Sequence, residues 1–235
     1  MMPAPAALRQ RSRTLLVAAS VPLALAALFA DDVRVRHQLE AARHQLEAAR
    51  KDPLTGLPDR DALTTCITRL ARSHRGQLHV LVADADGLKA VNDSLGHAAG
   101  DTLIATIGHR LGTWATARGG VAARLGGDEF GAALLLPLGT DAAHEVVALR
   151  ALLAQPVDHD AQVLRPAVSI GTARAGDLPD TAGASRILRG ADRAMYLVKT
   201  GEQPCGYVAT RQDAYAPTVR GRRPGRPGTH LATSR

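Results

Sequence analysis

A Gly-Gly-Asp-Glu turn between two apolar segments constrains the fold of this chain most strongly. Residues 121–124 and 129–136 are mostly apolar and lie on either side of Gly126, Gly127 and Asp128. Glycine and aspartate between two such segments predict a β-hairpin, because tight hairpin turns need backbone conformations that glycine adopts readily. A third apolar segment, residues 78–83, ends at Asp84 and predicts another strand. The sheet therefore contains a hairpin and a strand that ends in a carboxylate.

The residues around these strands predict one α+β domain over residues 52–209. Apolar spacing and capping residues favour helices at 59–75, 93–117, 142–154 and 182–199. Further strands are expected at residues 164–173 and, as a short last strand, near residues 207–209. Apolar residues make up 46% of the chain and aromatic residues only 3%, so the core must consist mainly of Ala, Leu and Val.

An uncharged apolar segment, residues 14–30, follows a short basic segment at residues 1–13. Its length is at the short end of what a membrane-spanning helix needs, and we favour a transmembrane anchor. The alternatives are a cleaved secretory signal and an interfacial or buried helix. Basic residues flank both sides of the segment, so charge counting does not fix the orientation. Such an anchor would place the chain in the inner membrane as a single-pass protein, with the domain that follows expected in the cytoplasm.

Residues 31–51 contain the heptad HQLEAAR twice in succession. Leu39, Ala42, Leu46 and Ala49 recur at the spacing of a coiled-coil seam, which predicts a linker helix that pairs two chains. The alternative is a single amphipathic helix that packs on its own domain.

The net charge of +7 comes almost entirely from arginine, because the chain has only three lysines. This usage is typical of a genome-wide composition bias, and the basic residues cluster at the two ends. The Gly- and Pro-rich segment at residues 210–235 is predicted to be a disordered basic tail. Few aromatic side chains are available to stack on bases, so we do not expect a nucleic-acid partner. Two widely separated cysteines, Cys66 and Cys205, predict neither a zinc site nor a disulfide framework.

Carboxylates follow the strand at residues 78–83 and occupy the hairpin turn. If the hairpin pairs with this strand, Asp128 comes beside Asp84, and the two carboxylates could hold one or two Mg²⁺ ions against a triphosphate. The alternatives are a simple polar turn, a calcium loop, for which the closing glutamate is missing, and a plain hairpin. The only asparagine, Asn92, and two of the three lysines, Lys89 and Lys199, also fall within the candidate motifs.

Six motifs follow one another along the chain: DPLTGLPDR (52–60), DADGLKAVND (84–93), GHAAGD (96–101), RLGGDEF (124–130), VSIG (168–171) and ADRAMY (191–196). In this order they resemble the motifs of GGDEF-domain diguanylate cyclases. The resemblance covers about 150 residues and implies a palm-like, mainly antiparallel sheet flanked by helices, preceded here by the N-terminal apolar helix and the short coiled coil.

The resemblance also implies residue roles. Asp84, Asp128 and the Ala85 carbonyl match the ligands of Mg²⁺ (or Mn²⁺), and Glu129 matches an acid proposed to assist deprotonation of the attacking 3′-hydroxyl. Asn92 and Asp101 match the pair that reads guanine. Phosphate contacts would come from Lys89, Lys199 and the backbone at Gly87, Leu88, Gly126 and Gly127.

The implied reaction is condensation of two GTP molecules into cyclic di-GMP with release of pyrophosphate, by a homodimer. Three departures from the family pattern stand out: Thr200–Pro204 in place of Gly-Arg-Asn, Gly87–Leu88 where an aromatic residue is common, and 117–120 without an Arg-x-x-Asp motif. The first removes a phosphate-binding arginine. The alternative function is therefore a degenerate domain that binds GTP or cyclic di-GMP without turnover.

Overall fold

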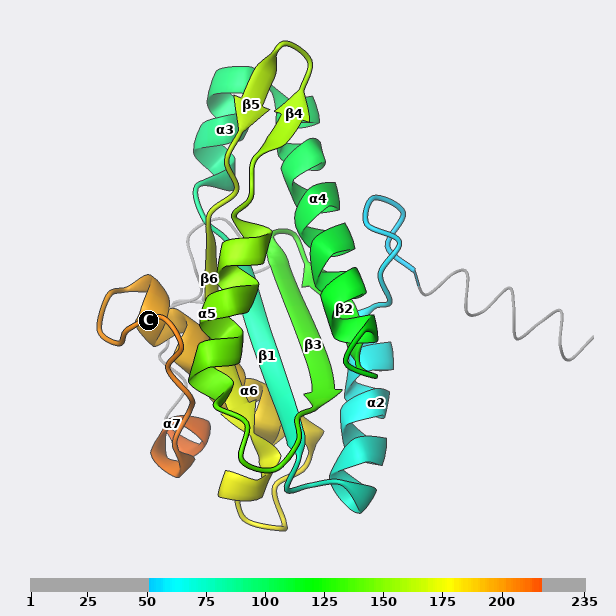
Figure 1. Cartoon of the computed structure of the whole chain (residues 1–235), viewed down its shortest axis with the longest axis vertical. Coiled ribbons are helices and arrows are strands. Elements are labelled where there is room, and N and C mark those ends of the chain that lie inside the picture. The colour runs from blue at the N-terminus through cyan, green and yellow to red at the C-terminus, as the bar shows by residue number, and fades with distance from the viewer. Residues whose placement is uncertain (1–50, 217–235) are drawn as a thin grey trace, which may run out of the picture. The chain divides into compact units, whose positions relative to one another are not determined.

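The computed structural model describes residues 51–216 of the chain (Figure 1). The predicted anchor, nearly all of the coiled-coil linker and most of the basic tail lie outside the described residues. Within residues 51–216 no helix is both long and apolar enough to cross a membrane.

Four antiparallel strands form the central sheet, in the order β2 (Val121–Gly126), β3 (Glu129–Leu135), β1 (Leu78–Ala85) and β6 (Val168–Arg174). The predicted hairpin and the strand that ends in a carboxylate are therefore confirmed, and the hairpin does pair with that strand. Because β1 lies between β3 and β6, its backbone is hydrogen-bonded on both edges. All eight of its residues are buried.

Helices cover both faces of the sheet (Figure 1). Side chains alternate between the faces along each strand, so Val80 and Val82 pack with α2 (Arg60–Ser73) and α6 (Ala184–Lys199). Leu81 and Ala83 point to the opposite face, which α4 (His97–Thr116) and α5 (Ala142–Leu153) cover. We call these the α2/α6 face and the α4/α5 face. The predicted α+β fold, an antiparallel sheet flanked by helices, is confirmed.

Helix α6 approaches the sheet unusually closely at Gly171 of β6. A Cβ atom at this position would lie 1.9 Å from the Met195 backbone nitrogen and 2.5 Å from the Ala191 carbonyl oxygen. Only a residue without a side chain fits there. This contact sets the helix directly on the strand and brings the C-terminal end of α6 to the end of β1.

The predicted helix at residues 93–117 is in fact two helices, α3 (Leu88–Leu95) and α4. Gly96 separates them with a φ of +86°, a conformation that ends the first helix and reorients the chain. The helices predicted at 59–75, 142–154 and 182–199 are confirmed as α2, α5 and α6, within two residues at each end.

The strand predicted at residues 164–173 is wrong at its N-terminal end. Residues Gln162–Leu164 form β5, which pairs with β4 (Val157–His159) in a separate two-stranded hairpin beside α3 and α4 (Figure 1). Pro166 lies between β5 and β6 and has no N–H group with which to continue a ladder. The short last strand near residues 207–209 is reduced to one parallel bridge between Thr172 and Val208.

The folded chain continues beyond residue 209. After the short 3₁₀ helix η1 (Ala175–Asp177) and α6, residues Arg211–Tyr215 form α7. Thr210 and Asp213 make a capping box, the Tyr207 hydroxyl donates to Asp213 Oδ2 at 2.7 Å, and Ala214 is fully buried. The prediction that the disordered tail begins at residue 210 is therefore wrong for these residues, because the cap and the packing of α7 on α6 order them.

Candidate functional site

Lys199 bridges two carboxylates at the end of β1. Asp84 is 0% exposed. Lys199 lies in the last turn of α6, and its Nζ donates a hydrogen bond to Asp84 Oδ1. The same Nζ lies 3.0 Å from Asp86 Oδ1. A buried carboxylate is costly unless a cation or hydrogen bonds compensate its charge, and Lys199 provides this compensation. Ser169 of β6 donates to Asp86 Oδ2 at 2.7 Å and so orients the second carboxylate.

Glu129 is the direct neighbour of Asp84 across the strands β1 and β3. The residue is 7% exposed, and its Oε2 lies 3.9 Å from an Arg60 guanidinium nitrogen at the start of α2. Asp128 lies one residue further along, where its carbonyl oxygen accepts a hydrogen bond of 3.0 Å from Ala85 N–H. The expectation that Asp128 comes beside Asp84 is therefore refined: the Asp128 backbone lies opposite Ala85, and Glu129 is the residue paired with Asp84.

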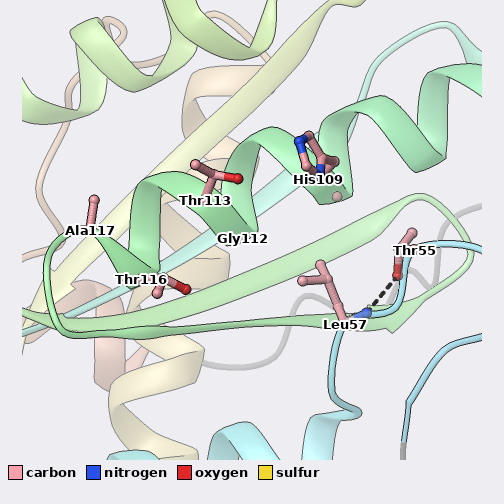
Figure 2. A pocket seen from close by; sticks show the side chains of 8 residues that line it. Thr55, Leu57, His109, Gly112, Thr113, Thr116 and Ala117 are labelled. Carbon is pink, nitrogen blue, oxygen red and sulfur yellow. Dashed lines mark hydrogen bonds between the residues drawn. The ribbon is translucent and has the colours of Figure 1, made fainter.

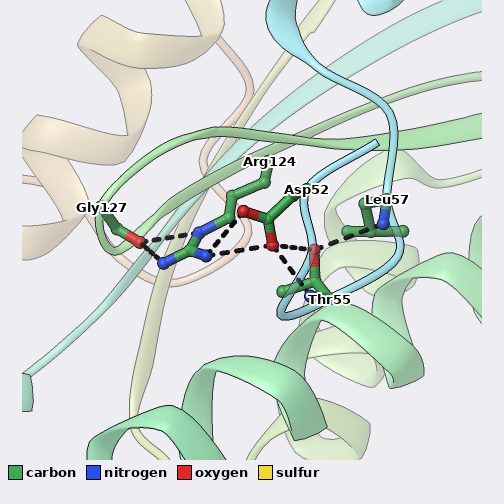
Figure 3. A network of polar contacts seen from close by, with 5 residues as sticks. All are labelled: Asp52, Thr55, Leu57, Arg124 and Gly127. Carbon is green, nitrogen blue, oxygen red and sulfur yellow. Dashed lines mark hydrogen bonds and ion pairs between the residues drawn. The ribbon is translucent and has the colours of Figure 1, made fainter. Parts of the chain in front are cut away.

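Arg124 holds the hairpin turn to the segment that precedes α2 (Figure 3). Its guanidinium donates to both carboxylate oxygens of Asp52, at 3.0 and 2.9 Å, and to the Gly127 carbonyl oxygen, at 3.0 and 2.7 Å. Gly126 and Gly127 have φ values of +142° and +53°, which residues with side chains rarely adopt. The turn is thus fixed by two glycines and one arginine.

Asp52 remains ionised because of this network. Partial burial alone would raise the pKa of its carboxyl group, but hydrogen bonds from the Thr55 hydroxyl and N–H and the nearby Arg124 guanidinium lower it overall. The Arg124–Asp52 ion pair therefore persists well into the acidic range.

The N-terminal end of α3 lies just after the two carboxylates. Gly87 caps this helix in the left-handed conformation with φ +71°, and the first helical hydrogen bond runs from Val91 N–H to the Gly87 carbonyl. The preceding N–H groups, at Leu88, Lys89 and Ala90, therefore point out of the helix end, an arrangement that favours anions. The Lys89 side chain is exposed in this first turn.

Asn92 packs against Gly100, which immediately precedes Asp101. A Cβ atom at Gly100 would lie 1.9 Å from Asn92 Oδ1, so only glycine leaves room for this side chain. Asn92 Oδ1 is buried, and no described residue donates a hydrogen bond to it. A buried acceptor without a donor is costly, and a bound ligand with an N–H group could satisfy it. The exposed Asp101 follows in α4, so the two residues predicted to read guanine lie on adjoining helices.

The donor set at the end of β1 is compatible with a divalent cation. Mg²⁺ prefers oxygen ligands and is commonly held by one or two carboxylates together with substrate phosphates. Asp84 and Asp86 already share one cation, the Lys199 ammonium group. Among residues 51–216 no group of three or more His, Cys, Asp and Glu side chains is arranged to hold a metal by itself. These residues therefore fit a metal that arrives with phosphate better than a metal bound by protein alone.

The described residues also form a groove at the side of α4. This groove of about 530 Å³ separates the segment with Thr55 and Leu57 from the side of α4 (Figure 2). Its other lining residues are Gly108, His109, Gly112, Thr113, Thr116 and Ala117. None of the residues that the sequence predicted for the site lines this groove, and it contains no acidic, lysine or arginine side chain.

Sequence reasoning gave no role to Asp86, Ser169, Asp52 or Arg124, although all four lie within the quoted motifs. Asp86 and Ser169 carried a signal: Asp86 is the second carboxylate after a buried strand, and Ser169 is a polar residue between two apolar ones in another. The contact between Asp84 and Lys199 spans 115 positions of sequence and had no local signal.

Comparison with known families identifies this arrangement. The family model described as "Diguanylate cyclase, GGDEF domain" matches residues 49–204, which is more than half of the chain. The chain belongs to the GGDEF family. The resemblance found in the motifs is thereby confirmed.

Three relatives of this GGDEF protein illustrate the similarity. A 19.3 kDa protein in the repSA 5′ region of Streptomyces ambofaciens is 42% identical over 154 residues, which cover 64% of this chain and 78% of that protein. The diguanylate cyclase TpbB of Pseudomonas aeruginosa is 40% identical over 154 residues, which cover 63% of this chain and 34% of TpbB. The diguanylate cyclase DgcP of Escherichia coli is 34% identical over 166 residues, which cover 67% of this chain and 47% of DgcP. The match thus spans about a third of TpbB and about half of DgcP.

Solved structures of GGDEF domains have the same fold. The GGDEF domain of TpbB superimposes with a TM-score of 0.62 at 34% identity, covering 70% of this chain and 97% of that one. A second structure contains the coiled coil and GGDEF domain of DgcB from Caulobacter crescentus in complex with c-di-GMP. It superimposes with a TM-score of 0.63 at 26% identity, and the match covers 81% of this chain and 99% of that one.

Proposed function

We propose that this GGDEF protein is a diguanylate cyclase, which condenses two GTP molecules into cyclic di-GMP and releases two pyrophosphates. The observation that carries the proposal is the meeting of Asp84, Asp86 and Lys199 beside the Gly-Gly-Asp-Glu turn and the start of α3. Carboxylates, a lysine and helix N–H groups together are what a metal-bound triphosphate requires. Relatives named as diguanylate cyclases support the same reaction.

In each condensation, the 3′-hydroxyl oxygen of one GTP attacks the α-phosphorus of the other. A phosphodiester bond forms, the bond to pyrophosphate breaks, and the hydroxyl proton leaves. Asp84, Asp128 and the Ala85 carbonyl would hold Mg²⁺ or Mn²⁺, which neutralises phosphate charge when bound. Glu129 would assist removal of the proton, and an Arg60 guanidinium nitrogen lies 3.9 Å from its carboxylate. Phosphate would be bound by Lys89, Lys199 and the N–H groups of Gly87, Leu88, Gly126 and Gly127.

Asn92 and Asp101 would select guanine. The Asn92 oxygen that lacks a donor can accept from a guanine N–H group, and the Asp101 carboxylate can accept another. Adenine presents no N1–H donor and an amino group at a different position. Binding of ATP would therefore leave the Asn92 oxygen buried and unpaired, which disfavours ATP.

The reaction needs two domains, because each holds one GTP. Leu39, Ala42, Leu46 and Ala49 would pair two chains as a homodimer, with residues 14–30 anchoring them in the membrane and the catalytic domain facing the cytosolic GTP. Changing Leu39 and Leu46 to Glu should separate the chains while preserving GTP binding, so that the rate rises steeply with protein concentration. Full activity in a demonstrably monomeric variant would refute the two-domain mechanism.

The direct experiment is to incubate the purified full chain with GTP and Mg²⁺ and to identify the products by mass spectrometry. Cyclic di-GMP and pyrophosphate in a 1:2 ratio are expected, with no product from ATP. Asn92→Ala should weaken binding of GTP more than binding of ATP. Conversion of ATP at a comparable rate would overturn the assignment of Asn92 and Asp101.

A degenerate binding domain is the second candidate, and one feature favours it. After Lys199, Thr200 ends α6 and donates to Glu202 Oε1 at 2.8 Å, so an acid stands where the family pattern has a phosphate-binding arginine nearby. Saturable GTP or cyclic di-GMP binding with no product over a long incubation would select this alternative.

A further inference from the structure

The Lys199 ammonium group contacts the carboxylate of Asp84, which is one of the residues proposed to hold the divalent cation. Its Nζ contacts Asp84 Oδ1 by a hydrogen bond and lies 3.0 Å from Asp86 Oδ1. Asp86 Oδ1 is buried and receives no well-directed hydrogen bond from the described residues, so its contact with Lys199 is chiefly electrostatic. One positive charge thus serves two carboxylates.

Contacts on two sides position this ammonium group beside the carboxylates. The contact of α6 with Gly171 delivers the end of the helix to β1, and Ser169 orients Asp86 from the other side. The two ends of the bridge differ: Asp84 is 0% exposed, whereas the Lys199 side chain is 33% exposed. Asp84 cannot move to solvent without disturbing β1, but Lys199 can rotate outward on its flexible stem.

We propose that Lys199 is a built-in competitor of the divalent cation: it neutralises Asp84 and Asp86 while no nucleotide is bound, and it moves to the triphosphate when Mg²⁺ takes its place. The inference rests on the proposed function and adds an order of events to it. Two cations cannot share these carboxylates without strong repulsion. Mg²⁺ alone must displace Lys199 into water, whereas Mg²⁺ with GTP offers the ammonium group a new anionic partner.

A purely structural ion pair makes a different prediction. If Lys199 only stabilises the fold, its removal weakens the protein and leaves metal affinity unchanged. If Lys199 competes with the metal, its removal vacates the carboxylates and strengthens metal binding in the absence of nucleotide.

The test is Mn²⁺ binding to the full chain without nucleotide, measured by calorimetry and by the electron paramagnetic resonance signal of free Mn²⁺. We expect Lys199→Gln to bind Mn²⁺ at least tenfold more tightly than the unaltered chain. Lys199→Arg keeps a positive side chain at this position and should bind Mn²⁺ weakly. Lys51→Gln removes the same charge from an exposed position outside the site and should raise the affinity by less than threefold. Asp84→Asn should abolish the tight binding seen in Lys199→Gln.

Two results would overturn the proposal in distinguishable ways. Equal, measurable affinity in the unaltered chain and in Lys199→Gln would remove the competition but leave the metal site and the proposed function intact. Absence of Mn²⁺ binding in Lys199→Gln, with GTP-dependent binding also absent, would remove both.

The unaltered chain gives an independent readout should Lys199→Gln fold poorly. The chain has only three lysines, so nitrogen-15 labelling of lysine yields few ammonium signals. The Lys199 signal should stay unchanged with millimolar Mg²⁺ and shift when Mg²⁺ and a non-hydrolysable GTP analogue are added together. A full shift with Mg²⁺ alone would contradict the proposal.

Discussion

The two faces of the central sheet are buried in different ways. On the α4/α5 face, large side chains such as Phe130, Ile107 and Trp114 fill the core. On the α2/α6 face, Ile187 and Met195 of α6 are also buried, but Ala191 and Ala194 bring this helix directly onto Gly171. The second face also carries Asp84, Glu129 and Ser169 at one end, all buried.

This difference suggests that the two faces of the sheet contribute differently to folding and to the candidate site. The bulky residues of the α4/α5 face bury much apolar area. Small residues allow α6 to come close enough for its last residue, Lys199, to reach a buried carboxylate on β1. We therefore expect changes to the polar residues at the end of the α2/α6 face, around Asp84 and Lys199, to affect metal and nucleotide handling. Changes to core residues such as those of the α4/α5 face should affect mainly the free energy of unfolding.

The largest effect is expected at Gly171. Gly171→Val would place side-chain atoms into the backbone of α6, where even a Cβ atom would lie 1.9 Å from Met195 N. We expect a loss of more than about 4 kcal/mol in the free energy of unfolding, or failure to fold. Gly76→Ala is the matched control, since its nearest contact would be 3.9 Å away. Denaturant unfolding of both variants would measure the difference. A small loss of unfolding free energy in Gly171→Val would contradict the close approach of α6 to Gly171.

A pH-dependent loss of stability is expected on the α4/α5 face. Burial, followed by the nearby Arg174 charge, lowers the pKa of His79 from 6.5 to about 4. The unfolded chain therefore takes up a proton near pH 6.5, whereas the folded chain stays neutral until about pH 4. Stability should thus fall as the pH drops through this window, by up to about 3 kcal/mol.

Leucine in place of His79 should flatten this dependence between pH 7 and pH 4.5, as followed by urea unfolding. His109→Gln, at an exposed position of α4, is the control and should leave the slope as it is. A slope that persists in His79→Leu would assign the effect to other groups. Asp52 contributes only at lower pH, because its lowered pKa makes its stabilisation persist until the pH falls through that value.

A moderate effect is expected at Arg124, which fixes the turn at the functional end. Arg124→Ala removes the ion pair with Asp52 and both hydrogen bonds to the Gly127 carbonyl. We expect a loss of about 2 kcal/mol in stability, together with weaker nucleotide binding. Arg72→Ala, on the exposed side of α2, should change stability by less than about 0.5 kcal/mol. Equal effects of the two substitutions on nucleotide affinity would show that the turn needs no anchor.

The smallest effect concerns feedback. The segment before β2 lacks an Arg-x-x-Asp motif, and Arg118 is already paired with Glu145 at 3.0 Å and stacked on Trp114. The neighbouring groove offers no lysine or arginine to a product phosphate. Added cyclic di-GMP should therefore inhibit only weakly and in competition with GTP. Strong inhibition that excess GTP does not relieve would reveal a separate product site.

The sequence predicted the sheet because its strands are locally encoded. Residues 78–83 and 129–136 are mostly apolar segments, and the turn between β2 and β3 has a characteristic composition. The β4–β5 hairpin was missed because residues 157–164 are short and mixed in polarity, with no clear alternation. Its position depends instead on tertiary contacts, such as the hydrogen bond between Thr102 and His159 at 2.8 Å.

The site was predicted in part for the same reason. Asp84, Glu129, Asn92 and Asp101 lie in motifs that can be read along the chain. The Lys199 bridge depends on where α6 packs, and thus on Gly171, which is remote in sequence from β1. The anchoring of the turn likewise joins Arg124 to Asp52 across 72 positions. Contacts of this kind follow from packing, which local patterns do not specify.

The most direct test compares two buried residues on neighbouring strands, one on each face of the sheet. Asp84→Asn on the α2/α6 face should reduce cyclic di-GMP synthesis at least ~100-fold and leave a folded protein. Ile170→Val on the α4/α5 face should cost about 1 kcal/mol in stability and leave kcat within about twofold. Initial rates with GTP and Mg²⁺, measured with urea unfolding of the same samples, give both quantities. Synthesis that survives in Asp84→Asn, or that is lost in a folded Ile170→Val, would contradict the division of roles between the two faces.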